Sequence, residues 1–112
     1  MSVEQKVWNY FTEKNFSPSG IAGIMGNLYK ESKFKTNNLE DRCNIKFGLS
    51  DEQYTQGVDN NTYNLFINDG AGYGLAQWTW SGYKKDLYML CKSRNKSISD
   101  LDCQLEQLYK HL

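Results

Sequence analysis

Two segments of the chain carry residues that could do chemistry together. The first, residues 23–32, predicts a helix that ends on a lone carboxylate, Glu31. The second, residues 72–79, combines glycines with two aromatic side chains and the amide of Gln77. A carboxylic acid that faces a groove lined by aromatic rings and an amide is equipped to break a glycosidic bond. An enzyme is therefore the leading hypothesis.

Glu31 follows Leu28 by three residues and Ile24 by seven, so it shares their apolar helix face. A negative charge is disfavoured at the C-terminal end of a helix, and partial burial would act in the same direction. A glutamic acid that keeps its proton can donate it to a leaving-group oxygen. Spacing alone favours the plainer alternative, a solvated glutamate that ends a helix beside Lys30 and Lys33.

The second segment is interpreted through its side-chain types. Aromatic faces stack on sugar rings, and an amide offers both a donor and an acceptor to hydroxyl and N-acetyl groups. The combination of glycines with Tyr73, Gln77, Trp78 and Trp80 favours a substrate groove over an ordinary β-hairpin with a core face. Residues 70–74 do not support a phosphate-binding loop, because they lack the G-x-G-x-x-G spacing and no clear strand precedes them.

Five helices are expected to position these segments, and residues 72–79 are expected to form a small hairpin. The second helix has Ser17 as its N-cap and Pro18 at its first position. Its glycines at 20, 23 and 26 suggest close packing against a neighbour. Ser50 is expected to open the third helix, and Ser99 with Asp102 to form a capping box for the last. The expected helices cover residues 3–14, 18–31, 51–57, from 81 onward and from 99 onward.

Length and charge narrow the classes of protein. A chain of 112 residues predicts a single domain, mainly α with a small β element (class α+β). The 13 basic and 13 acidic side chains cancel, and no basic stripe suggests a nucleic-acid partner or a membrane-surface helix. No apolar run approaches the roughly 20 residues of a membrane span, and no signal peptide is evident. Because the last helix stops at residues 110–112 without a cap, we expect a monomeric domain cut from a longer protein.

The cysteines and the single histidine suggest no further chemistry. The spacings of Cys43, Cys91 and Cys103 match neither a disulfide framework nor a zinc site, so buried free thiols are expected. A thiol peptidase or amidase that pairs a cysteine with His111 is a third hypothesis, but no activating sequence surrounds any of the cysteines. We expect no metal and no organic cofactor.

Residues 19–28 with Glu31-Ser32, followed by residues 72–79, resemble the phage tail lysozyme family. Its members are lysozyme-like domains of phage tail proteins, with relatives in mobile elements of Gram-positive bacteria. More distantly, Glu31-Ser32 and residues 74–77 are similar to the Glu-Ser and Gly-Leu-x-Gln motifs of lytic transglycosylases and goose-type lysozymes. The resemblance runs from about Val7 to Leu112.

The resemblance implies a lysozyme-like fold and cleavage of the β-1,4 bond between N-acetylmuramic acid and N-acetylglucosamine in peptidoglycan. Glu31 would be the general acid. The substrate-binding residues would be Ser32, Tyr73, Gln77, Trp78 and Trp80. The implied partners are glycan strands and other domains of a parent protein. The implied place of action is the cell wall, reached as part of a phage tail or of a mobile-element protein.

Three questions stay open. A hydrolase is favoured over a lytic transglycosylase, because the later Ala-Tyr-Asn-type motif is absent. A catalytically silent wall-binding or tail-structural module is the rival from another class. The second carboxylate would lie about 5 Å from the acid in a retaining enzyme and roughly 6.5–9.5 Å away in an inverting one. Asp69 is preferred for it, and an N-acetyl group of the substrate could replace it. The other candidates are Asp59, Asp51, Asp41 and Glu40.

Overall fold

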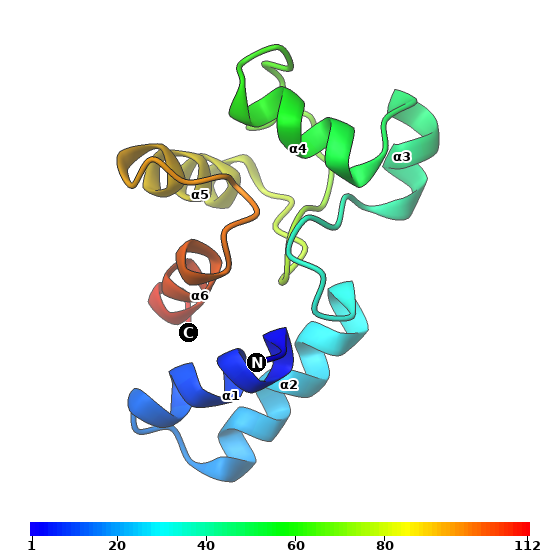
Figure 1. The fold of residues 1–112 in the computed structure, drawn as a ribbon. Coiled ribbons are helices and arrows are strands. Elements are labelled where there is room, and N and C mark those ends of the chain that lie inside the picture. Colours follow the sequence, from blue (N-terminus) through cyan, green and yellow to red (C-terminus); the bar gives the residue numbers. More distant parts are fainter.

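Six helices and almost no extended structure make up the computed structural model, which describes all 112 residues (Figure 1). The mainly helical class is confirmed. Helices α1 and α2 lie together at one end of the molecule, and α3 and α4 lie at the other, with the segment before α5 running between them. The helices are α1 (Val3–Glu13), α2 (Pro18–Ser32), α3 (Asp41–Phe47), α4 (Asp51–Asp59), α5 (Ser81–Ser93) and α6 (Leu101–Lys110).

Side-chain caps start most of the helices. The hydroxyl of Ser17 accepts a hydrogen bond from the Gly20 N–H at 3.1 Å, and Ser50 forms a capping box with Gln53, so both expected caps are confirmed. The cap expected at Ser99 is wrong. The carboxylate of Asp100 accepts from the Cys103 N–H at 3.0 Å instead, so the N-cap of α6 lies one residue later than expected.

Helix α3 was not expected from the sequence. It has seven residues, its N-cap residue Glu40 makes no side-chain cap, and Gly48 ends it in the left-handed conformation (φ 67°). A helix this short without a side-chain cap leaves a weak signal in a sequence. It contributes Cys43 to the core, and Asp41 starts it at the surface.

The expected β-hairpin is absent. Residues 72–79 contain only isolated bridges, Leu39 with Tyr73 and Tyr73 with Trp78. Tyr73 and Trp78 exchange backbone hydrogen bonds of 3.1 and 3.0 Å, which closes a tight turn. Positive φ angles at Gly74 (81°) and Gln77 (52°) reverse the chain within that turn, so no paired strands extend from it.

Gln104 of α6 holds this turn in place. Its side chain is fully buried, and its Oε1 accepts from the Leu75 N–H at 2.9 Å. Its Nε2 donates to the carbonyl groups of Thr36 (2.7 Å) and Ile98 (2.9 Å). A Cβ at Gly74 would lie 2.9 Å from the Gln104 Oε1, so the close approach requires glycine. One amide thereby fixes the turn to the loop that follows α2.

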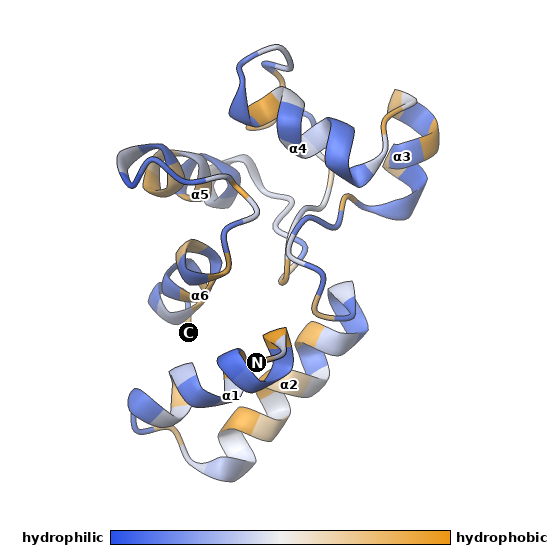
Figure 2. Ribbon diagram, in the orientation of Figure 1, coloured by the Kyte–Doolittle hydropathy of each residue, from blue (hydrophilic) through white to orange (hydrophobic).

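Two hydrophobic clusters stabilise the fold. Helix α1 packs on α2 and α6, and α5 packs on α6. Along the helices, apolar positions alternate with hydrophilic ones, as expected of helices that bury one side (Figure 2). All three cysteines are buried free thiols, as expected. No helix combines the length and apolar composition needed to cross a membrane.

The first hydrophobic cluster contains Val7, Phe11, Ile21, Leu28, Leu75 and Leu105. The second contains Leu39, Cys43, Tyr54, Val58, Phe66, Ala71, Tyr73, Trp78, Leu87, Cys91, Ile98 and Cys103.

The close packing expected at the glycines of α2 is wrong for two of them. A Cβ at Gly23 or Gly26 would meet no atom within 4 Å, and both residues are exposed. We therefore predict that Gly26→Ala raises the free energy of unfolding by about 0.5–1 kcal/mol, because alanine lowers the entropy of the unfolded chain. Urea unfolding of Gly26→Ala measures this. Gly20→Ala is the control, because its Cβ would lie 3.1 Å from the capping hydroxyl of Ser17 and should bring a smaller gain or a loss.

Candidate active site

Glu31 lies in the last turn of α2, and its side chain is exposed. The partial burial expected from its spacing is wrong, because the chain turns away directly after the helix. Lys33 (φ 52°) and Phe34 (φ 63°) are consecutive left-handed residues without glycine, a conformation that costs of order 1 kcal/mol or more per residue. The Lys33 N–H caps the helix on the Tyr29 carbonyl at 2.9 Å. This strained turn ends α2 at Ser32, one residue after Glu31, and the Glu31 carboxylate lies at the surface.

Two hollows meet at Glu31. The first is polar, with a volume of about 550 Å³, and the second is mainly apolar, with a volume of about 250 Å³. Glu31 is the one residue that lines both. The polar hollow is lined by Lys30, Glu31, Ser32, Lys33, Phe34, Lys35, Asn38 and Asp41. The apolar hollow is lined by Ile24, Asn27, Leu28, Glu31, Ala76, Leu108 and Leu112. A long ligand with polar and apolar faces could therefore lie across both hollows and contact the Glu31 carboxylate.

The residues that the family resemblance assigned to substrate binding do not line one common groove. Ser32 lines the polar hollow but is buried, and its hydroxyl donates to the Leu28 carbonyl at 3.1 Å. Tyr73 is fully buried and shares a hydrogen bond of 2.5 Å with Thr55, and Trp78 is also buried. The rings of Tyr73 and Trp78 are core residues, so the interpretation of these two as groove-lining residues is contradicted by their burial.

The side-chain amide of Gln77 joins two backbone segments of the chain. Its Nε2 donates to the carbonyl groups of Asn38 (2.8 Å) and Gly74 (3.0 Å). Asn38 lines the polar hollow, so Gln77 positions one wall of that hollow. The Gln77 Nε2 therefore makes its hydrogen bonds within the protein.

Asp69 lies in the interior, away from the Glu31 hollows. Its carboxylate is 2.5 Å from the ammonium of Lys84, and the side chains are 4% and 0% exposed. It also accepts hydrogen bonds from the hydroxyls of Tyr54 (2.6 Å) and Tyr63 (2.7 Å) and from the Ala71 N–H (2.9 Å). Every strong acceptor position of this carboxylate is occupied. Asp69 is therefore a structural residue, and its assignment as the second carboxylate is wrong.

The buried network changes the acidity of its members. Burial, together with the hydrogen bond to Asp69, raises the pKa of Tyr54. Burial lowers the pKa of Lys84, while its hydrogen bond to Asp69 acts in the opposite direction. Lys84 also donates to the Ala71 carbonyl at 2.7 Å, so the pair holds the backbone just before the glycine turn.

Asp41 is the remaining carboxylate that shares a hollow with Glu31. It is exposed, at the first position of α3, and it lines the polar hollow. The other three candidates stabilise the backbone. The Gly72 N–H and the neighbouring Arg42 lower the pKa of Glu40, against the effect of its burial. The carboxylates of Asp51, Asp59 and Glu40 accept from the N–H groups of Leu39 (3.1 Å), Ile98 (3.0 Å) and Gly72 (3.1 Å), respectively.

Trp80 begins an exposed aromatic shelf, which we define as Trp80, Tyr83 and His111. Trp80 is 63% exposed, and its ring meets Tyr83 edge-on with centroids 4.9 Å apart. Tyr83 in turn lies 4.4 Å from the His111 ring. The Trp80 ring packs so closely over Gly82 that a Cβ there would lie 2.5 Å from it. At the other end of the shelf, His111 directly precedes Leu112, which lines the apolar hollow.

Sequence reasoning named Lys30 and Lys33 only as neighbours of Glu31 at the helix end, and it did not predict that lysines line the polar hollow. Lys30, Lys33 and Lys35 all line it, and their clustering around Glu31 in the sequence was the available signal. Lys35 is paired with Asp51 at 2.6 Å, a contact that raises its pKa. The hollow therefore has a basic rim of three lysines around two carboxylates, those of Glu31 and Asp41. No three His, Cys, Asp or Glu side chains gather closely enough to hold a metal ion.

Glu31 is therefore an exposed carboxylate at the meeting of a polar and an apolar hollow in a small helical domain. The model of the phage tail lysozyme family matches residues 2–112, so this chain belongs to that family, and the resemblance is confirmed. Membership indicates a lysozyme-like peptidoglycan hydrolase. Neither the curated proteins nor the solved structures compared with the chain gave a significant match.

Proposed function

We propose that this domain is a muramidase that hydrolyses the β-1,4 bond between N-acetylmuramic acid and N-acetylglucosamine, with Glu31 as the general acid. The observation that carries the proposal is the position of Glu31, which alone lines both hollows. The Glu31 carboxyl donates its proton to the glycosidic oxygen as the bond from that oxygen to C1 breaks. A water then adds its hydroxyl to C1 and gives its remaining proton to a second carboxylate, and Glu31 regains its own proton from the solvent.

The basic rim supports peptidoglycan as the glycan. Lys30 and Lys33 carry positive charge at the polar hollow without a partner carboxylate in the chain. Muramic acid bears a lactyl group that continues into a peptide with free carboxylates, whereas chitin is neutral. Charge complementarity therefore favours the peptidoglycan strand over a neutral N-acetylglucosamine polymer. We place the protein's action at the cell wall, as part of a phage tail or a mobile-element protein.

Formation of new reducing ends in purified peptidoglycan tests this activity. The domain should generate reducing ends, and treatment with iodoacetamide should leave the rate unchanged, because all three thiols are buried and none lines either hollow. Release of free amino groups without reducing ends, or loss of activity on alkylation of the folded protein, would point to an amidase or peptidase instead.

Asp41 is our proposal for the second carboxylate, because it shares the polar hollow with Glu31. We predict that Asp41→Asn lowers kcat on peptidoglycan by about 10²-fold or more, since the variant cannot accept a proton from water. Glu52→Gln, an exposed carboxylate in the first turn of α4, is the matched control and should keep full activity. An active Asp41→Asn would instead favour assistance by the substrate's own N-acetyl group.

The aromatic shelf is proposed to bind sugar rings beyond the apolar hollow. Trp80→Ala should raise KM for glycan strands by about fivefold to 100-fold with little change in kcat, because a stacking surface of about 1–3 kcal/mol is lost. Trp80→Phe should recover part of the affinity. Initial rates over a range of strand concentrations measure both constants. A kcat that falls while KM stays constant would contradict a purely binding role.

The alternatives differ in their products. A lytic transglycosylase would use the 6-hydroxyl of muramic acid in place of water and release anhydro ends. A silent wall-binding or tail-structural module would bind glycan and release nothing. We favour hydrolysis because the polar hollow at Glu31 is open and hydrophilic, so water can reach the reacting carbon.

A further inference from the structure

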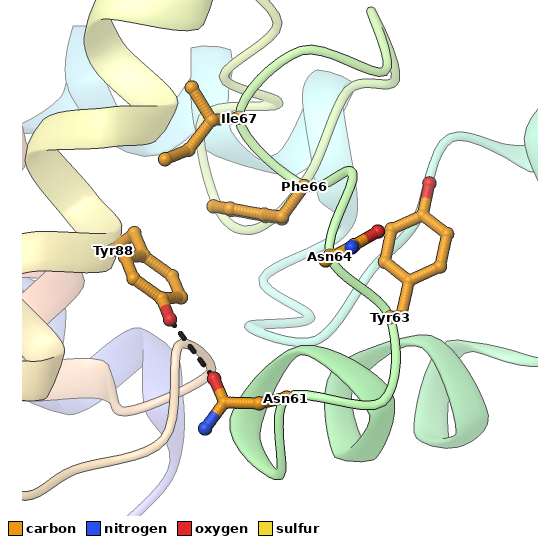
Figure 3. Close-up of a pocket in the computed structure, with 6 residues that line it drawn as sticks. All are labelled: Asn61, Tyr63, Asn64, Phe66, Ile67 and Tyr88. Atoms are coloured by element: carbon orange, nitrogen blue, oxygen red, sulfur yellow. Dashed lines mark hydrogen bonds between the residues drawn. The ribbon is translucent and has the colours of Figure 1, made fainter.

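A separate pocket lies between α5 and the loop that follows α4. Its volume is about 150 Å³, and it shares no lining residue with the hollows at Glu31. Figure 3 shows Tyr88 of α5 facing the loop that carries Phe66 and Ile67, with the Tyr88 hydroxyl bonded to Asn61. The pocket is lined by Asn61, Tyr63, Asn64, Phe66, Ile67 and Tyr88.

The lining defines the chemistry of a ligand. No charged side chain is among the lining residues, so a neutral ligand fits best. Tyr88 donates to the Asn61 Oδ1 at 3.1 Å, which leaves the Asn61 Nδ2 free to donate outward. The Asn64 amide makes no hydrogen bond within the chain, so it offers a donor and an acceptor beside aromatic rings.

The walls of the pocket are held firmly. The Tyr63 hydroxyl is fixed on Asp69 at 2.7 Å, and the ammonium of Lys84 lies 4.4 Å from the centroid of the Phe66 ring. The buried pair of Lys84 and Asp69 therefore contacts two side chains that line the pocket, those of Phe66 and Tyr63. A preformed site loses little freedom when a ligand binds.

We propose that this pocket binds the acetamido group of an N-acetylated sugar, as a glycan-binding site separate from the catalytic groove. A volume of 150 Å³ corresponds to about five water molecules of about 30 Å³ each, enough for the few heavy atoms of an acetamido group. Its methyl group would contact Tyr88 and Phe66, and its C=O and N–H would pair with the free amide atoms of Asn61 and Asn64. The choice of an N-acetylated glycan rests on the proposed function.

NMR titration of the isotope-labelled Glu31→Gln domain tests this site, because that variant should bind glycan without cleaving it. The probe is tri-N-acetylchitotriose, and the matched probe is triglucosamine, which has amines in place of the acetamido groups. We expect the signals of the Asn61 and Asn64 side-chain amides and of Ile67 to shift with the acetylated probe only. Equal shifts with triglucosamine, or shifts confined to the Glu31 hollows, would overturn the inference.

Asn64→Ala provides the second arm. Asn64 is exposed and unbonded, so its replacement should leave the fold intact while raising the dissociation constant at this pocket about fivefold to tenfold. Gln56→Ala, an exposed amide on α4 outside the pocket, should change nothing. Unchanged pocket affinity in Asn64→Ala would contradict the site. Binding by the pocket together with a wild-type domain that cleaves no peptidoglycan would refute the proposed activity alone.

Discussion

Glu31→Gln should lower the rate of peptidoglycan cleavage by about 10²–10⁴-fold, the usual contribution of a general acid. Glutamine keeps the shape and polarity of the side chain but cannot donate a proton to the glycosidic oxygen. Because Glu31 is exposed and makes no ion pair within the chain, the fold should be unaffected. The reducing-end assay measures the rate, and circular dichroism checks the helix content.

Glu13→Gln is the matched control for this prediction. Glu13 is also an exposed glutamate at the C-terminal end of a helix, α1, but it lines neither hollow. Its replacement should leave the rate unchanged. A fall of similar size in both variants would mean that the loss reflects surface charge and not proton transfer.

Lys84→Met should lower the free energy of unfolding by about 3–5 kcal/mol, a large share of the 5–15 kcal/mol typical of a domain. The substitution leaves the buried Asp69 carboxylate without its cation and removes the bond to the Ala71 carbonyl. The double variant with Asp69→Asn should recover part of this loss, since it removes the uncompensated charge. Urea unfolding of the single and double variants measures both effects.

Lys110→Met is the control for the buried pair. Its ammonium lies 3.5 Å from Glu106 at the surface, where an ion pair contributes less than about 1 kcal/mol. A Lys84→Met variant as stable as Lys110→Met would contradict the structural role of the buried network. Because that network holds the backbone before the glycine turn, loss of stability should be accompanied by loss of activity.

Local patterns predicted five of the six helices, and α3 is the one that they missed. In α2, Ser17 and Pro18 mark the start, and the apolar spacing from Ile21 to Leu28 marks the buried side, so the helix formed as expected. These signals act over a few residues and need no knowledge of the rest of the chain. The same is true of Glu31, whose place at the helix end follows from counting along α2.

The rest depended on contacts between distant residues. A lysine in an amphipathic helix is usually solvated, yet Lys84 shares the buried face of α5 with Leu87 and Cys91, three and seven residues later. That spacing was the available signal, but its partner Asp69 lies in a loop with no periodicity. Tyr73 and Trp78 have the side chains of a sugar-binding groove, and only the turn that pairs them shows that both face the core.

The second carboxylate illustrates the same limit. Position before the glycine turn favoured Asp69, but that carboxylate binds Lys84, and three of the other candidates bind backbone N–H groups. Asp41 is left because α3, a helix without a side-chain cap, presents it beside the end of α2 at the polar hollow. The role that we propose for Asp41 depends on tertiary structure that no local pattern contains.

Mass spectrometry of the fragments released from purified Gram-positive peptidoglycan by the wild type and by Glu31→Gln tests the central claim most directly. Our account predicts soluble muropeptides with reducing N-acetylmuramic ends from the wild type and almost none from the variant. The same fragments in equal amounts from a folded Glu31→Gln protein, or no fragments from a folded wild type, would contradict it.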